Sequence, residues 1–221
     1  TLVGGAAALR WPKQVESLMA LAGGVVLAAA FFDLLPGAVN RAVSIHMNVA
    51  VPIGMVLVGY FVFHTVEGLV HHRHHEGESS AAGIIGAIGF IIHSFFDGLA
   101  IGLGFRVDST LGILVAAAVI GHDFSDGLNT ISYLVAHKQP NGRSIRFLFA
   151  DAVSPLIGAV VASLTPVPAQ VFPISLGFFS GLFVYAATMN LLPRARNLPP
   201  RQSLSITLGG AAAMFLITRL A

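Results

Sequence analysis

Seven long apolar stretches set the strongest limit on what this chain can fold into. They lie near residues 17–36, 46–70, 81–104, 109–136, 145–164, 170–193 and 203–220. Each is close to or above the ~20 residues that a helix needs to cross a bilayer. Because 55% of the residues are hydrophobic and only 10% are charged, little of the chain can form a water-covered surface. The pattern predicts an all-α polytopic membrane protein.

An eighth apolar segment, residues 1–9, opens the sequence. It is too short to span a bilayer and begins with Thr1 rather than Met, which favours the end of a longer helix. We therefore expect eight transmembrane helices, the first of them incomplete. None of the linkers is long enough for a soluble domain, so residues 1–221 are expected to form a single transmembrane domain.

Lysine and arginine residues are unevenly shared between alternate linkers. Nine of the 12 fall on one side of the predicted membrane and three on the other. Since cytoplasmic loops are enriched in Lys and Arg, the linkers near 10–16, 71–80, 137–144 and 194–202 are expected in the cytoplasm. Dispersal of the charges over these loops argues against nucleic-acid binding, although the pI is about 9.4. The compact loops favour a bacterial inner membrane.

Two similar motifs, 29 residues apart, place ionisable side chains inside apolar stretches. They are His93–Leu99, with the sequence HSFFDGL, and His122–Leu128, with the sequence HDFSDGL. In each motif a His precedes an Asp by four residues, so both side chains lie on one face of a helix. Two such helices packed side by side could bring two imidazoles and two carboxylates together. The four candidate metal ligands are His93, Asp97, His122 and Asp126.

This ligand set suits a divalent metal ion. Two neutral imidazoles and two carboxylates balance the charge of the ion and suit tetrahedral Zn²⁺, while Cd²⁺, Fe²⁺, Mn²⁺ and Co²⁺ fit the same atoms. Asp123 is a candidate accessory ligand or proton acceptor. Gly98 and Gly127 each follow an Asp and are expected to let the two helices approach closely. The alternatives are structural hydrogen bonds between His and Asp, and a proton relay without metal.

Other polar residues mark candidate positions along an ion path. Residues 32–36 (FDLLP) are echoed by residues 189–193 (MNLLP), at the ends of two helices with opposite predicted directions. Inverted repeats of this kind are common in transporters. The histidine-rich linker 71–80 is suited to capturing metal loosely. The candidate path residues are Asp33, His64, Glu67, Ser94 and Asn190.

Together these motifs resemble the ZIP family of divalent-metal transporters. Its helix-four pattern, His-Asn-x-Pro-acid-Gly, is similar to residues 93–98, and its helix-five pattern is similar to residues 122–127. The resemblance implies eight helices arranged as inverted three-helix repeats around a central pair, with a primary site at the four ligands named above. Ser94 replaces an Asn that serves a second metal in the family, which favours one metal per site. Phe96 and Ser125 stand where the family has kink-forming prolines.

The expected function is movement of a divalent metal, first of all zinc, toward the cytoplasm. The metal is the substrate, no cofactor is expected, and the pattern leaves a homodimer open. A proton-coupled exporter of the cation diffusion facilitator type is an alternative, although such exporters usually have six helices and a soluble C-terminal domain. A non-transporting metal-binding relative is another. An enzyme is not expected, because an intramembrane metallohydrolase would most recognisably carry a His-Glu-x-x-His motif, and none is present.

Overall fold

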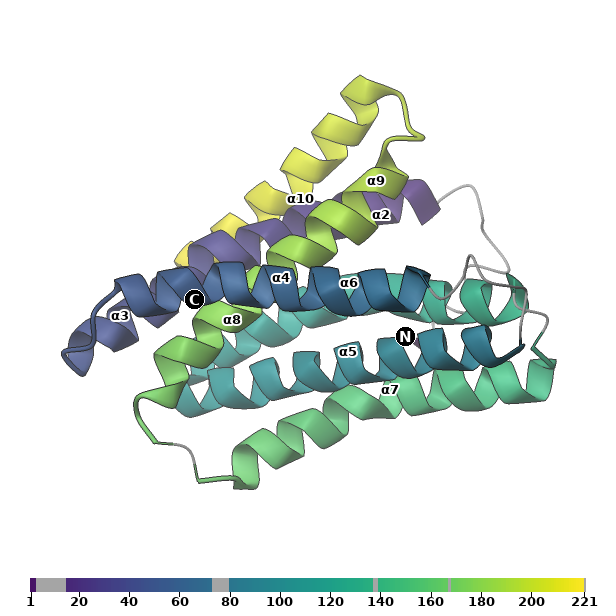
Figure 1. Ribbon diagram of the computed structural model, residues 1–221. Helices are drawn as coiled ribbons and strands as arrows, with labels where there is room; N and C mark the ends of the chain where they lie inside the picture. Colours follow the sequence, from purple (N-terminus) through teal and green to yellow (C-terminus); the bar gives the residue numbers. More distant parts are fainter. Residues whose placement is uncertain (3–14, 73–79, 137–138, 167, 221) are drawn as a thin grey trace.

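A computed structural model describes the chain apart from residues 3–14, 73–79, 137–138, 167 and 221 (Figure 1). Within these described residues the structure is helical and has no strand. The predicted first helix and most of the predicted loop 71–80 lie outside the described residues. The prediction of an all-α protein is confirmed.

The helices follow the predicted apolar spans. The first long segment is continuous and consists of α2 (Val15–Ala29), the π-helical turn η1 (Ala30–Leu34) and α3 (Leu35–Ser44). Next come α4 (Ala50–His72), α5 (Ser80–Val107), α6 (Ser109–Ala136) and α7 (Asn141–Leu164). A second continuous segment consists of α8 (Val171–Tyr185), η2 (Ala186–Leu191) and α9 (Leu192–Ala195), and α10 (Pro200–Leu220) is last. In the described part of the chain, four spans are long and apolar enough to cross a membrane: Glu16–Ser44, Ala87–Val107, Gly142–Leu164 and Val171–Leu191.

The helices pack in neighbouring pairs. In Figure 1, α10 runs beside α2 at one edge of the bundle, and α7 runs beside α5 at the opposite edge. Helix α4 packs along α8, and α5 packs along α6, so the two helices that carry the His and Asp motifs are direct neighbours. Many residues of the buried apolar core come from α2, α6 and α8, among them Val26, Val115, Leu176, Leu182 and Phe183.

Glycines bring several of these helix pairs into close contact. A Cβ added at Gly59 of α4 would lie 2.0 Å from the carbonyl oxygen of Phe178 on α8. A Cβ at Gly98 of α5 would lie 2.0 Å from the carbonyl oxygen of Pro155 on α7. The prediction for Gly98 was therefore wrong in its partner, because this glycine admits α7 rather than α6. Small residues at such contacts let two backbones approach within membrane proteins.

Two π-helical turns interrupt the long segments at the echoed sequences. Leu35 donates its N–H to Ala30 O, and Leu192 donates its N–H to Ala187 O, in both cases five residues back. A proline follows each leucine and has no N–H to donate, so a regular α-helical hydrogen bond is lost there and a wider turn accommodates the change. Helices α5 and α6 run without interruption, in keeping with Phe and Ser at their expected proline positions.

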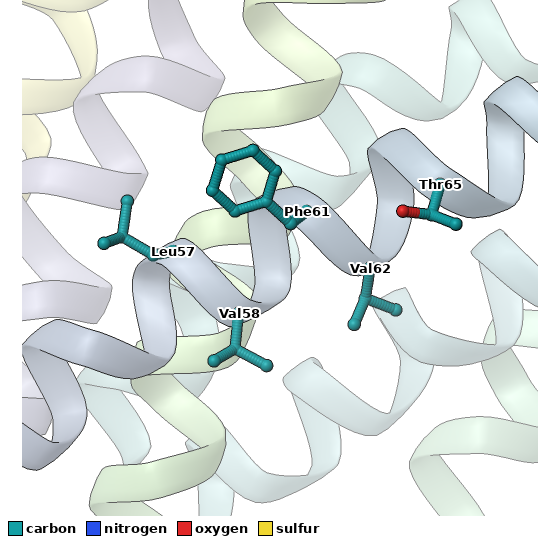
Figure 2. A pocket seen from close by; sticks show the side chains of 5 residues that line it. All are labelled: Leu57, Val58, Phe61, Val62 and Thr65. Atoms are coloured by element: carbon teal, nitrogen blue, oxygen red, sulfur yellow. The ribbon is translucent and has the colours of Figure 1, made fainter.

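The outer face of α4 is apolar and open. Figure 2 shows side chains of Leu57, Val58, Phe61, Val62 and Thr65 around a shallow groove on this face. Leu57 is 63% exposed and Phe61 is 57% exposed. A water-soluble protein rarely exposes such a continuous apolar surface, whereas lipid covers it without cost. The exposed side chains of α4 therefore fit a helix at the lipid boundary.

Candidate metal site

Three of the predicted ligands meet between α5 and α6. His93 and Asp97 lie one turn apart on α5, and Asp126 faces them from α6. One ligand atom from each residue lies within 4.8 Å of the others. All three residues are buried: His93 is 9% exposed, Asp97 1% and Asp126 6%. The spacing of four residues that predicted a shared helical face for His93 and Asp97 thus places both at the contact with α6.

The distances suit a small divalent cation. His93 Nε2 lies 3.4 Å from Asp97 Oδ2 and 3.9 Å from Asp126 Oδ2. Two ligands that each lie ~2.0–2.1 Å from a tetrahedral Zn²⁺ are about 3.3 Å apart. The first pair already has about this separation, and the second would need to close by about 0.6 Å. Two carboxylates and one neutral imidazole supply two negative charges, which match those of a divalent ion.

The other two predicted ligands differ in how they are placed. His122 lies in α6, one helical turn before Asp126, and its side chain is outside the described part of the structure. Asp123 is half-buried and does not belong to the three-residue group. Its carboxylate contacts Thr1.

Aromatic rings cover one side of the cluster. Phe63 of α4 meets the His93 ring edge to face, with 5.2 Å between the centroids. The same Phe63 ring contacts Phe96 of α5 and Tyr185 at the end of α8. These rings exclude water from the imidazole on that side, so the electrostatic attraction between the ligands and a cation is screened less than it would be in water.

A second polar group lies beside the cluster. Asp151 of α7 is fully buried and accepts hydrogen bonds from Ser94 Oγ at 2.6 Å and from Thr130 Oγ1 at 2.8 Å. Sequence reasoning named Ser94 as a candidate path residue and as the replacement of the family's Asn, and it did not include Thr130. The available signal was its position on α6, one turn after Asp126, which places it on the same helical face as that ligand.

The remaining candidate path residues are on η1, η2 and α4. Asp33 is buried in η1, beside Thr218 of α10, and Asn190 is half-buried in η2. His64 is exposed on α4, and its ring contacts Tyr185. The side chain of Glu67 lies outside the described residues. Among the described residues, neither Asp33 nor His64 belongs to the three-residue group.

A helical protein with several long apolar spans belongs to the class of polytopic membrane proteins, and its buried His/Asp/Asp group between two adjacent helices is a candidate metal site. The family model described as ZIP zinc transporter matches residues 71–218, which include both helices of the cluster. The chain belongs to the ZIP family. It is therefore a transmembrane protein of a zinc-transport family, as the motifs predicted.

Several curated relatives are zinc transporters from animals. The chain is 34% identical over 142 residues to zinc transporter SLC39A7 of Mus musculus. The matched region covers 59% of this chain and 30% of that protein. It is 26% identical over 191 residues to zinc transporter ZIP13 of Pongo abelii, covering 81% of this chain and 58% of that protein. The chain thus matches less than a third of the length of the SLC39A7 relative and somewhat more than half of ZIP13.

Proposed function

We propose that this chain transports a divalent metal, above all Zn²⁺, across the membrane through the site between α5 and α6. The observation that carries the proposal is the buried group of His93, Asp97 and Asp126, whose ligand atoms lie within 4.8 Å of one another. Burying two carboxylates inside an apolar bundle is costly unless a cation or another partner compensates them. Membership of a zinc-transporter family supports the same assignment.

The chemistry of the site follows from its ligands. A divalent metal displaces any proton held by His93 and binds the two ionised carboxylates, so binding is coupled to proton release. We assign the fourth position to His122, because it lies one turn before Asp126 on α6, and an accessory role to Asp123. Oxygen and nitrogen ligands without a thiolate also accept Cd²⁺, Fe²⁺, Mn²⁺ and Co²⁺. The site therefore selects for charge and size more than for softness.

We also propose the architecture of eight helices with inverted three-helix repeats. The hydrogen bonds that end η1 and η2 support this architecture. The donors Leu35 and Leu192 are 157 residues apart, and the acceptors Ala30 and Ala187 are also 157 residues apart. Packing supports it as well. A Cβ at Gly59 of α4 would meet Phe178 O on α8, and a Cβ at Gly210 of α10 would lie 2.3 Å from Leu21 O on α2. The two residues whose carbonyl oxygens make these contacts, Leu21 and Phe178, are again 157 positions apart.

The direction and the path are part of the same proposal. The excess of Lys and Arg in alternate linkers supports placing those linkers in the cytoplasm. We propose that metal enters from the opposite side and is released to the cytoplasm, as the family resemblance implies. Asp33 and Asn190, at corresponding positions of the two π-helical turns, and His64 with Glu67 on α4 are proposed contacts for metal on its way. The linker 71–80 then receives metal on the cytoplasmic side. The short loops support a bacterial inner membrane, although the relatives named above are animal proteins.

The test is metal uptake into proteoliposomes that contain a fluorescent chelator, with Zn²⁺, Cd²⁺, Fe²⁺ and Mn²⁺ compared. The variant carries Asp97→Asn and Asp126→Asn together, and Asp108→Asn is the control. Asp108 lies on the linker before α6, where its side chain accepts a hydrogen bond from Leu111 N at 2.8 Å, a role that Asn retains. We expect uptake by the parent and the control and none by the double variant. Uptake that is equal in all three would refute the assignment of the site. Tight binding without uptake in the parent would favour a metal-binding relative that does not transport.

A further inference from the structure

Asp151 joins the two helices that carry the metal ligands. Its Oδ1 accepts a hydrogen bond from Ser94 on α5, and its Oδ2 accepts one from Thr130 on α6. All three side chains are buried: Asp151 and Thr130 are 0% exposed and Ser94 is 1% exposed. One carboxylate on α7 thus contacts both ligand helices at the same depth in the bundle.

The two hydroxyl donors stand next to the ligands in the sequence. Ser94 directly follows His93, and Thr130 lies one helical turn beyond Asp126. Because both helices are uninterrupted here, a displacement of either hydroxyl also displaces the neighbouring ligand. The two hydrogen-bond distances from Asp151 to Ser94 and Thr130 therefore help to set the distance between His93 on α5 and Asp126 on α6.

Helix α7 is itself held firmly on α5. Ser154 Oγ donates to Ile91 O at 2.7 Å, one turn before Ser94. A Cβ at Gly158 would lie 2.2 Å from Phe95 O, so the two backbones are in direct contact there. A buried hydroxyl bond and close backbone packing resist sliding of one helix along the other. Helices α5 and α7 thus form a stable pair, and Thr130 attaches α6 to this pair through Asp151.

We infer that Asp151 is a positioning residue, which sets the separation of the ligands on α5 and α6 and so tunes which metal fits. The inference rests on the proposed metal site. Sites of this kind have to hold their ligands within about 0.2 Å of the distances that a given metal requires. A group beside the ligands that fixes the helix spacing controls this tolerance directly. Both oxygens of Asp151 accept hydrogen bonds from hydroxyl groups. We therefore assign this carboxylate to holding the ligand helices in place rather than to coordinating the metal.

The experiment compares metal binding by the parent with that of Asp151→Ala and Thr130→Val. Thr130→Val keeps the shape of the side chain and removes the hydroxyl, so it tests the inference even if Asp151→Ala fails to fold. Thr165→Val is the control, since this residue directly follows α7 and, in the described part of the chain, its hydroxyl donates to Val161 O of that same helix. Affinities for Zn²⁺ and Cd²⁺ and the visible absorption of bound Co²⁺ are measured on folded protein in detergent. The Co²⁺ spectrum reports coordination geometry, which a general loss of stability does not change.

For both test variants we expect Zn²⁺ to bind ~10–100-fold more weakly than in the parent. We also expect an altered Co²⁺ spectrum and a changed ratio of Zn²⁺ to Cd²⁺ affinity, with the control unchanged. Unchanged affinity and spectrum in folded Thr130→Val would overturn the inference. Complete loss of one bound metal in Asp151→Ala, with Thr130→Val unaffected, would also overturn it, because Asp151 would then be a ligand. If His93→Ala binds metal as the parent does, the proposed site itself fails, which is a separate outcome.

Discussion

Gly24 of α2 and Gly181 of α8 make the same kind of contact with a neighbouring helix. A Cβ at Gly24 would lie 2.0 Å from Thr207 O on α10, and a Cβ at Gly181 would lie 2.0 Å from Val56 O on α4. The two glycines are 157 positions apart, as are the hydrogen-bonded leucines that end the π-helical turns. In each of the two long segments, a glycine thus lets a neighbouring helix pack directly against the backbone: α10 at Gly24 and α4 at Gly181.

The first prediction concerns these helix contacts. Gly59→Ala on α4 should destabilise the protein by about 1–3 kcal/mol, because its Cβ would overlap the backbone of α8. Gly54→Ala on the same helix is the matched control. Among the described residues, no atom outside the adjoining backbone of α4 lies within 4 Å of its added Cβ, so it should be neutral or stabilise the helix by ~0.5–1 kcal/mol. Thermal unfolding in detergent checks both, and equal melting temperatures for the two variants would contradict the packing.

The second prediction concerns the end of α3. His46 has a φ of 56°, in the left-handed region, and Met47 N donates to Ala42 O at 2.8 Å across this turn. This is the hydrogen-bond pattern that most often ends a helix with glycine. His46→Gly should therefore stabilise the protein by ~0.5–1 kcal/mol, while His46→Val should destabilise it. The order of their melting temperatures tests this, and a more stable Val variant would argue against the turn.

The third prediction concerns metal binding as a source of stability. Zn²⁺ at a concentration 100 times its Kd should stabilise the folded parent by ~2.7 kcal/mol, since it binds the folded state only. His93→Ala removes a ligand of the cluster and should lower the affinity by more than ~100-fold, which exceeds the usual effect of losing a supporting group. The stabilisation should then vanish at the same zinc concentration. Melting curves with and without zinc measure it, and an equal zinc effect in the variant would place the site elsewhere.

The fourth prediction concerns the bond that anchors η1. Ser180 of α8 is fully buried and donates to Ala30 O at 3.0 Å. Ser180→Ala should cost about 1 kcal/mol, because Ala30 O still accepts the N–H of Leu35 and is not left unsatisfied. Ser205→Ala is the control, since that exposed hydroxyl donates to Arg201 O in its own helix and, within the described residues, to no other helix. Chemical denaturation that finds a larger cost at Ser205 would contradict this account.

Much of the fold was predictable because it depends on local properties of the sequence. Long apolar stretches favour helices in any surroundings, and the helices observed follow the predicted spans closely. The family was also predictable, since the His and Asp motifs that indicated it lie within consecutive residues. The partner of Gly98 was not, because a small residue shows only that some backbone can approach it. The choice of α7 over α6 depends on how the whole bundle packs.

The sequence by itself determined the helices, the family and the residue types at the site, because hydrophobic length and four-residue spacing act within a single helix. Only the tertiary structure decided that Asp126 of α6 faces His93 and Asp97 of α5 at ligand distance. It alone also placed Asp151 between Ser94 and Thr130. Those relationships depend on how α5, α6 and α7 rotate and slide against one another. That arrangement is set by glycine contacts and buried hydroxyl bonds between residues far apart in the sequence.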